Sequence, residues 1–179
     1  SRMASLVRGV MARSTASIAW AASRMGTGSS AKRIVAPRQI ERAALMMAHR
    51  QELVSQLSLH LAHEAVSHNV IAPRGVVANI VKIHRETVGK SYISHTARNV
   101  VASVQTLAAR GPDEWQKQIT LVIPDEAHHY LREGTFGKAA SMFPNARMVG
   151  FTATPQRADG RGLGAHADGI FNSLVVGPT

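Results

Sequence analysis

Several features are missing from this sequence, and each absence excludes some kinds of protein or binding site. None of the 179 residues is cysteine, which excludes disulfide bonds and thiolate metal sites and is compatible with the cytoplasm. No apolar run approaches the roughly 18 residues that a membrane-spanning helix needs. Residues 1–40 contain seven Lys and Arg side chains but no acidic side chain. We therefore expect a cytoplasmic protein without a membrane anchor, whose first 40 residues differ from the rest.

The overall composition is that of a folded domain. Hydrophobic residues make up 45% of the chain and charged residues 18%, which is typical of a globular rather than a disordered protein. A chain of this length suffices for one domain with its own hydrophobic core. The net charge is +10, and such a basic balance suits a polyanionic partner such as nucleic acid.

Residues 1–33 are rich in Ser, Ala, Met and Arg and show no clear hydrophobic period. Three interpretations are open: an organelle-targeting peptide, a mobile basic arm, or sequence foreign to the domain, such as an out-of-frame translation or a fragment end. We favour the third, because a motif expected in this stretch is not intact. We therefore divide the chain into an irregular basic segment, residues 1–40, and a domain, residues 41–179.

Short apolar runs alternate with helical patterns from residue 41 onward. Strands are predicted over residues 43–48, 99–104, 120–124 and 146–151, with a last short strand over 171–176. Helices are predicted over 51–68, from 105 to about 111, and over 136–142, whereas 84–97 is polar and irregular. In the first helix, Leu53, Leu57, Leu61 and Ala65 share one face and are expected to meet the core. The alternation favours an α/β domain with a mainly parallel sheet flanked by helices.

One apolar run, Thr120–Pro124, stops at two adjacent carboxylates, Asp125 and Glu126. A short run that is apolar on both faces is typical of a strand buried in a parallel sheet. Open α/β sheets bind their ligands at the carboxyl ends of such strands. We therefore expect Asp125 to meet a magnesium ion and Glu126 to face the molecule beside it. The alternative is a surface turn in which two acidic residues are adjacent by chance.

The residues Asp125-Glu-Ala-His128 resemble the DEAH form of the Walker B motif, and Thr152-Ala-Thr154 resembles motif III of superfamily 2 helicases. In this order they make residues 41–179 similar to the first RecA-like, P-loop NTPase domain of the phage and type III restriction group of DEAD/DEAH helicases. Taken alone, the threonines fit an ordinary ST-turn.

The resemblance implies a role for each of these residues. Asp125 would hold magnesium through water, and Glu126 would orient the water that attacks the γ-phosphate of ATP. His128 would couple the nucleotide state to the rest of the motor. Thr152 and Thr154 would contact the nucleotide cleft and link ATP hydrolysis to movement along nucleic acid.

Two further stretches resemble the nucleic-acid-binding motifs of that domain, namely His49-Arg50 and Gln105-Thr106. In the family both lie along the path of a single strand. Physically, a strand that feeds a helix presents free N–H groups to phosphates, and Arg50 and Thr106 would add side-chain donors. The alternative is ordinary helix entry with Thr106 as a cap. The resemblance implies DNA as the track, with RNA as the alternative.

The phosphate-binding loop of the family is incomplete in this sequence. The family requires a glycine-rich loop that ends in Gly-Lys-Thr or Gly-Lys-Ser, ahead of His49. The candidate here would use Gly28 and Lys32 to bind the phosphates of ATP. However, Ala31 stands where glycine is expected, and Arg33 replaces the hydroxyl that binds magnesium. Whether the chain hydrolyses ATP is therefore left open.

The function implied by the resemblance is that of an ATP-dependent helicase or translocase with ATP and Mg²⁺ as ligands. Motors of this superfamily hold ATP between two RecA-like domains, and the second supplies an arginine finger that is worth about 10³–10⁵ in rate. We expect this chain to hold only the first domain, with a second helicase domain as its missing partner. It would then be a truncated product with little unwinding activity of its own.

Two other classes of function remain open. One is a nucleic-acid-binding module that keeps the fold and does not hydrolyse ATP. The other is a metal-dependent hydrolase built on Asp125, Glu126, His128 and His129, although these lack the HExxH arrangement.

Overall fold

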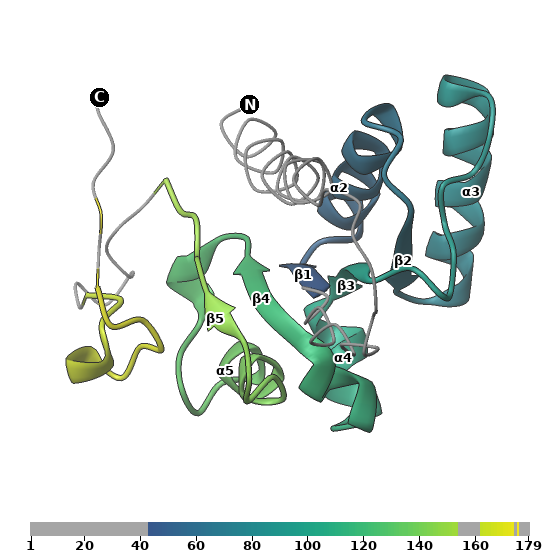
Figure 1. Cartoon of the computed structure of the whole chain (residues 1–179). Helices are drawn as coiled ribbons and strands as arrows, with labels where there is room; N and C mark the ends of the chain where they lie inside the picture. The colour runs from purple at the N-terminus through teal and green to yellow at the C-terminus, as the bar shows by residue number, and fades with distance from the viewer. Residues whose placement is uncertain (1–42, 154–161, 174, 176–179) are drawn as a thin grey trace, which may run out of the picture. The chain divides into compact units, whose positions relative to one another are not determined.

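A five-stranded parallel sheet, in the order β2-β3-β1-β4-β5, forms the framework of the protein (Figure 1). The computed structural model describes residues 43–153, 162–173 and 175. The chain divides into two units, Ser1–Ile40 and Glu41–Thr179, and the described residues belong to the second. Every pair of neighbouring strands is parallel, which confirms the predicted α/β class.

The strands are β1 (Ala43–Ala48), β2 (His68–Ile71), β3 (Asn99–Ser103), β4 (Ile119–Pro124) and β5 (Arg147–Met148). The helices are α2 (Gln51–His63), α3 (Arg74–Val88), α4 (Val104–Arg110) and α5 (Thr135–Ser141), with 3-10 turns η2 (Glu114–Gln118), η3 (Ala127–His129) and η4 (Ala165–Ala167). An α-helix lies between each strand and the next, as crossovers between parallel strands require. Among the described residues, every helix is too short or too polar to cross a membrane.

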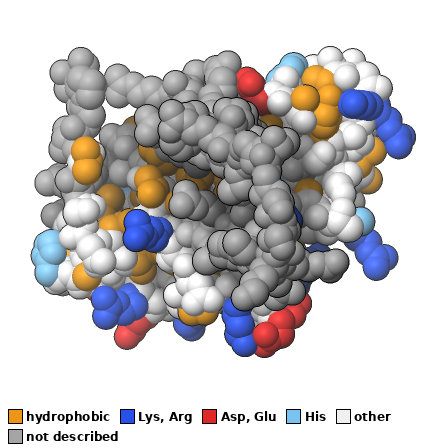
Figure 2. Space-filling view, in the orientation of Figure 1, with side chains coloured by type: hydrophobic (Ala, Val, Ile, Leu, Met, Phe, Trp, Pro, Cys, Tyr) orange, Lys and Arg blue, Asp and Glu red, His pale blue; other side chains and the backbone are white. Residues whose placement is uncertain are grey.

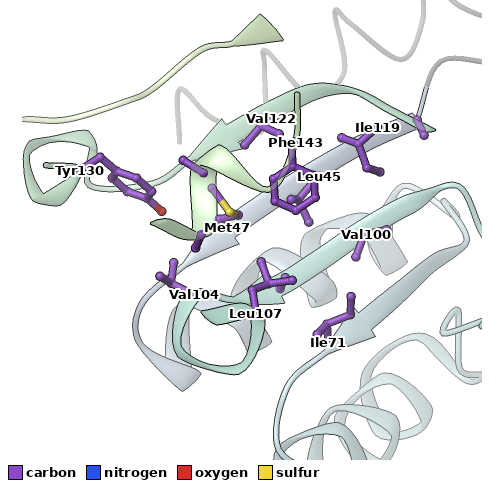
Figure 3. Close-up of a cluster of buried hydrophobic side chains, with 14 residues drawn as sticks. Leu45, Met47, Ile71, Val100, Val104, Leu107, Ile119, Val122, Tyr130 and Phe143 are labelled. Carbon is purple, nitrogen blue, oxygen red and sulfur yellow. The ribbon is translucent and has the colours of Figure 1, made fainter. Parts of the chain in front are cut away.

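The central strand β1 lies between β3 and β4, and all six of its residues are buried. Its residues Leu45 and Met47 belong to a hydrophobic cluster that also contains Leu107 of α4 and Phe143, two residues beyond α5 (Figure 3). The helices α2 and α3 lie together on the opposite side of the sheet from α4 and α5 (Figure 1). A strand covered on both faces is apolar throughout, which explains why this run shows no alternation.

The helix predicted over residues 51–68 is shorter than expected. The structure ends α2 at His63, and Ala65, which we expected to face the core, is exposed with a φ of 55°. The N–H of Val66 donates to the carbonyl of Leu61, and the N–H of Ala65 donates to that of Ala62. These two bonds form a Schellman motif, which normally places glycine in the left-handed position. Because alanine occupies that position here, the end of α2 cannot be recognised from the sequence.

Two further predictions about secondary structure are wrong. The segment 84–97 is not wholly irregular, because α3 continues to Val88 and ends at Gly89. Ile80 and His84 of α3 are buried, and Val76, Val77 and Val81 on the same side are partly buried. In the described part of residues 171–176 no strand forms, and Phe171 makes only an isolated bridge, with Gly164.

A buried polar network joins α2, β2 and α3. The hydroxyl of Ser58 lies 2.6 Å from Nε2 of His68 and 3.1 Å from Nε2 of His84, and all three residues are fully buried. Nδ1 of His68 lies 2.9 Å from the carbonyl of Val66, and the N–H of Tyr92 donates to Nδ1 of His84. Since a carbonyl only accepts and an N–H only donates, these contacts assign one tautomer to each ring. His84 then donates to Ser58, which donates to His68.

Candidate active site

The carboxyl ends of β1, β3 and β4 meet at one edge of the sheet. The register pairs Met47 with Pro124 and Ala48 with Ser103, so the residues that follow these strands share that edge. The N–H of Asp125 donates to the carbonyl of Met47 over 2.9 Å, which fixes Asp125 directly beyond β4. This is the edge at which open parallel sheets bind ligands.

Asp125 and Thr152 leave neighbouring strands side by side. Asp125 forms a parallel bridge with Phe151, and the N–H of Ala127 donates to the carbonyl of Phe151 over 2.9 Å. Although β5 itself is only two residues long, these contacts extend its pairing with β4 as far as Phe151. The two stretches that resemble DEAH and motif III therefore lie against each other in space.

His128 connects the acidic turn with Thr152. Its Nδ1 lies 2.9 Å from Oγ1 of Thr152 and 3.3 Å from Oε2 of Glu126. A carboxylate oxygen can only accept, so a hydrogen on Nδ1 of His128 suits both neighbours. The N–H of Glu126 in turn donates to Oδ1 of Asp125 over 3.0 Å. The turn is thus tied to residues 151–152, which follow β5, through a side chain as well as through the backbone.

Glu126 has a left-handed backbone, with φ 52° and ψ 56°. This conformation costs a non-glycine residue about 1–2 kcal/mol, and residues held in it cluster at functional sites. The turn leaves the Glu126 side chain 39% exposed, within reach of water, while it remains close to His128. This strain could not be predicted from the sequence.

Burial raises the pKa of Asp125, and the charge of Glu126 raises it further, whereas the N–H of Glu126 and the charge of His49 lower it. A carboxylate that is partly removed from water gains from a nearby cation. Mg²⁺ fits, because it needs only one or two carboxylates and completes its shell with water and phosphate oxygens.

A transition-metal cage does not fit the site. Over the described ranges, no three His, Cys, Asp or Glu side chains are grouped so that they could hold a metal ion. The cluster of Asp125, Glu126, His128 and His129 therefore does not support the metal-dependent hydrolase.

Three imidazole rings and Phe136 of α5 pack beside the acidic turn. The ring of His129 lies 4.1 Å from that of His128 and 5.1 Å from that of His49, measured between centroids. Phe136 lies against both His49 and His129. Burial lowers the pKa of His129, and the charges of His128 and His49 lower it further. His49, which the sequence placed on the nucleic-acid path, therefore packs against the acidic turn, and its Nδ1 is buried.

The other residues predicted to contact nucleic acid lie where helices begin at the same edge. Arg50 is exposed at the N-cap of α2. Gln105 is exposed and Thr106 is half-buried in the first turn of α4. Thr106 is not the cap of that helix. Ser103 occupies the N-cap, and its hydroxyl donates to Oε1 of Gln105 over 2.9 Å.

Three of the predicted site residues, Gly28, Lys32 and Thr154, lie outside the described residues. The described side of the site therefore consists of Asp125, Glu126, His128 and Thr152, with Arg50, Gln105 and Thr106 at the same edge.

Comparison with known proteins identifies the family. Residues 22–157 match the family described as "Type III restriction enzyme, res subunit". None of the curated proteins matches the sequence. The family match begins earlier than residue 41, so it includes Gly28 and Lys32 as well as the acidic turn and Thr152. The chain belongs to the type III restriction enzyme res subunit family, and its domain is a RecA-like domain of helicase superfamily 2.

Proposed function

We propose that this chain is the ATP-binding motor domain of a helicase or translocase, and that it couples ATP to a single strand of DNA. Membership of the family supports an ATP-dependent motor of the helicase type. The observation that carries the proposal is the contact of 2.9 Å between His128 and Thr152, which joins the acidic turn to the segment after β5. Through such a contact, the conversion of ATP to ADP would move the residues after β4 and the residues after β5 together.

The chain's own residues support a division of roles. Asp125, partly buried at the strand end, would hold Mg²⁺, which neutralises charge on the phosphates when it is bound. The Glu126 side chain is 39% exposed and would accept a hydrogen bond from the attacking water. His128, held between Glu126 and Thr152, would fix the direction of that carboxylate. Through its contact with His128, Thr152 would transmit a movement of the acidic turn to the segment after β5.

The nucleic-acid contact would come from a few donors at the sheet edge. Arg50 is exposed at the start of α2, where free N–H groups favour a phosphate. Gln105 and Thr106 lie in the first turn of α4, at the same edge. On the face drawn in Figure 2, the Lys and Arg side chains of the described residues are scattered and do not form one broad patch.

A second function is favoured by the phosphate-binding loop itself. Ala31 replaces a glycine and Arg33 replaces the hydroxyl that binds magnesium, so a nucleic-acid-binding module without hydrolysis is the alternative. The family match includes this loop. The match supports the loop as part of the domain, but it does not support hydrolysis of ATP by the loop.

The two functions are separated by measuring ATP and single-stranded DNA binding, and ATP hydrolysis, with the protein of 179 residues. We expect ATP to bind with Mg²⁺, and DNA to raise the hydrolysis rate. Glu126→Gln should abolish hydrolysis and leave ATP binding within about threefold. Glu133→Gln, a change at an exposed residue, is the matched control. DNA binding without affinity for ATP would favour the binding module, and binding of neither ligand would overturn both functions.

A further inference from the structure

The segment 162–173 folds back onto the loop that follows the acidic turn (Figure 1, yellow). The N–H of Arg132 donates to the carbonyl of Asp168 over 3.0 Å, and Leu131 forms an antiparallel bridge with Gly169. Gly169 is buried, and a side chain there would collide with the carbonyl of Leu163. The segment is therefore tied to the chain three residues beyond His128.

The same segment is also closed on itself. The N–H of Gly169 donates to the carbonyl of Gly164 over 3.0 Å, and the N–H of Ala165 donates to that of Phe171 over 2.9 Å. Gly164 and Phe171 also form a parallel bridge. These bonds give Phe171 a defined position, although it belongs to no strand.

The ring of Phe171 lies against both halves of the candidate site. A Cβ atom built on Gly150 would lie 2.5 Å from Cζ of Phe171 and 2.7 Å from Cβ of Ala127. Gly150 is two residues before Thr152, and Ala127 lies between Glu126 and His128. Phe171 thus occupies the space that a side chain at position 150 would need, where the segment after β5 meets the acidic turn.

We propose that residues 162–173 act as a clasp and that Phe171 is a positioning residue for the contact between His128 and Thr152. Ala127 and Gly150 are close neighbours of the two groups that this contact joins. Without the ring, the turn and the strand lose a shared packing partner on this side. The effect on catalysis rests on the proposed function, whereas the effect on the contact does not. A displacement of about 1 Å at such a site can reduce the rate about a hundredfold.

The test is an NMR measurement of the ¹⁵N-labelled imidazoles, made on the protein without ligands. In the wild type, the shift of Nδ1 of His128 should report its hydrogen bond. Phe171→Ala should change that shift, and Phe171→Leu, which keeps apolar bulk, should restore most of it. Gly150→Ala should also change it, because its methyl group would meet both the ring of Phe171 and Cβ of Ala127. Asn172→Ala, at an exposed position in the same segment, is the control.

The buried rings of His68 and His84 report in the same spectra whether the fold is intact, because their network with Ser58 lies between α2, β2 and α3. If these signals stay unchanged and the His128 signal moves in Phe171→Ala, the clasp is supported. An unmoved His128 signal in Phe171→Ala overturns it.

ATP turnover measured on the same variants tests the catalytic part of the proposal. Phe171→Ala should lower kcat about tenfold or more and leave KM nearly unchanged, since positioning acts on the reacting geometry. An unchanged kcat would overturn a catalytic role for Phe171. If the wild type does not bind ATP, the proposed function fails, and the His128 signal still decides whether the clasp exists.

Discussion

Nδ1 of His128 and Oγ1 of Thr152 lie 2.9 Å apart although the two residues are 24 positions apart in the chain. They meet because β4 and β5 are parallel neighbours, so both strands end at the same edge of the sheet. The intervening chain crosses over through α5, which packs Phe136 against His49 and His129. Family membership shows the motor class, and the proposed function uses this contact to couple the acidic turn to the segment beside it.

The first prediction concerns Ser58, which is the only side chain that links the two rings within the buried network described above. Ser58→Ala would remove a partner from Nε2 of His68 and from Nε2 of His84. A buried polar group without a partner costs roughly 1–3 kcal/mol, so the free energy of unfolding should fall by about 2 kcal/mol or more. Urea unfolding at pH 7.5 measures it.

Ser55→Ala is the matched control for that change. Ser55 lies on the same helix, and its hydroxyl donates to the carbonyl of Gln51 at an exposed position. Such a change should stay within about 0.5 kcal/mol of the wild type. Equal stability of the two variants would show that the buried network does not stabilise the fold.

The second prediction is a loss of stability in mild acid. Burial lowers the pKa of both His68 and His84, so the folded protein holds these rings neutral. The unfolded chain takes up protons below a pH of about 6.5. The stability that these rings contribute is therefore present above about pH 6.5 and is lost as the pH falls toward the lowered folded values.

Urea unfolding at pH 7.5, 6.5 and 5.5 measures how steeply the free energy of unfolding falls with pH. This slope approaches about 1.4 kcal/mol per pH unit for each histidine. His84→Gln should reduce the slope, and His60→Gln, at an exposed position on α2, should not change it. A midpoint that stays constant between pH 7.5 and 5.5 would contradict the assignment of neutral tautomers.

The third prediction follows from the left-handed backbone of Ala65. Glycine removes a conformational cost of about 1–2 kcal/mol there, and the greater freedom of the unfolded chain offsets about 0.4–1 kcal/mol of the gain. Ala65→Gly should therefore raise the free energy of unfolding by up to about 1 kcal/mol. Ala109→Gly, at an exposed position in α4, should lower it by about 0.5–1 kcal/mol. The same sign for both changes would refute the Schellman closure of α2.

The fourth prediction concerns the stability cost of Asp125. Burial raises its pKa, so the charged form is disfavoured in the folded protein. The penalty is absent below the unfolded pKa of the carboxyl and is fully present above the raised folded pKa. Asp125→Asn removes the charge, and its amide oxygen can still accept from the N–H of Glu126.

Thermal unfolding at pH 7.5 should show that Asp125→Asn has a Tm equal to or above that of the wild type. The gain in the free energy of unfolding should be less than about 1 kcal/mol, because the site is partly solvated. The difference should disappear near pH 4. Asp113→Asn, at an exposed cap of η2, serves as the control. A large fall in Tm for Asp125→Asn would mean that the carboxylate stabilises the fold.

The sequence was sufficient to predict the framework, because buried parallel strands have a local signature. The runs at 43–48 and 120–124 are apolar without alternation, and both are strands of the observed sheet. Parallel strands end at a common edge, so the placement of Asp125 beside the strand that carries Thr152 also followed.

What the sequence could not predict depends on contacts between distant segments. His49 packs against His129 and against Phe136, which is 87 positions later and belongs to α5. The clasp depends on pairing between Leu131 and Gly169, across a loop with no pattern of its own. The end of α2 could not be predicted for a local reason. Ala65 adopts a left-handed conformation that glycine usually occupies, and alanine does not indicate a helix end.

The most direct test of the account is the effect of Mg²⁺ on the affinity for ATP, measured by calorimetry on the wild type and on Asp125→Asn. If Asp125 supports the metal at this edge of the sheet, Mg²⁺ should tighten ATP binding to the wild type at least about tenfold, or about 1.4 kcal/mol. Asp125→Asn should lose this gain, and Asp113→Asn should keep it. An ATP affinity that does not respond to Mg²⁺, or a gain that persists in Asp125→Asn, would contradict the account.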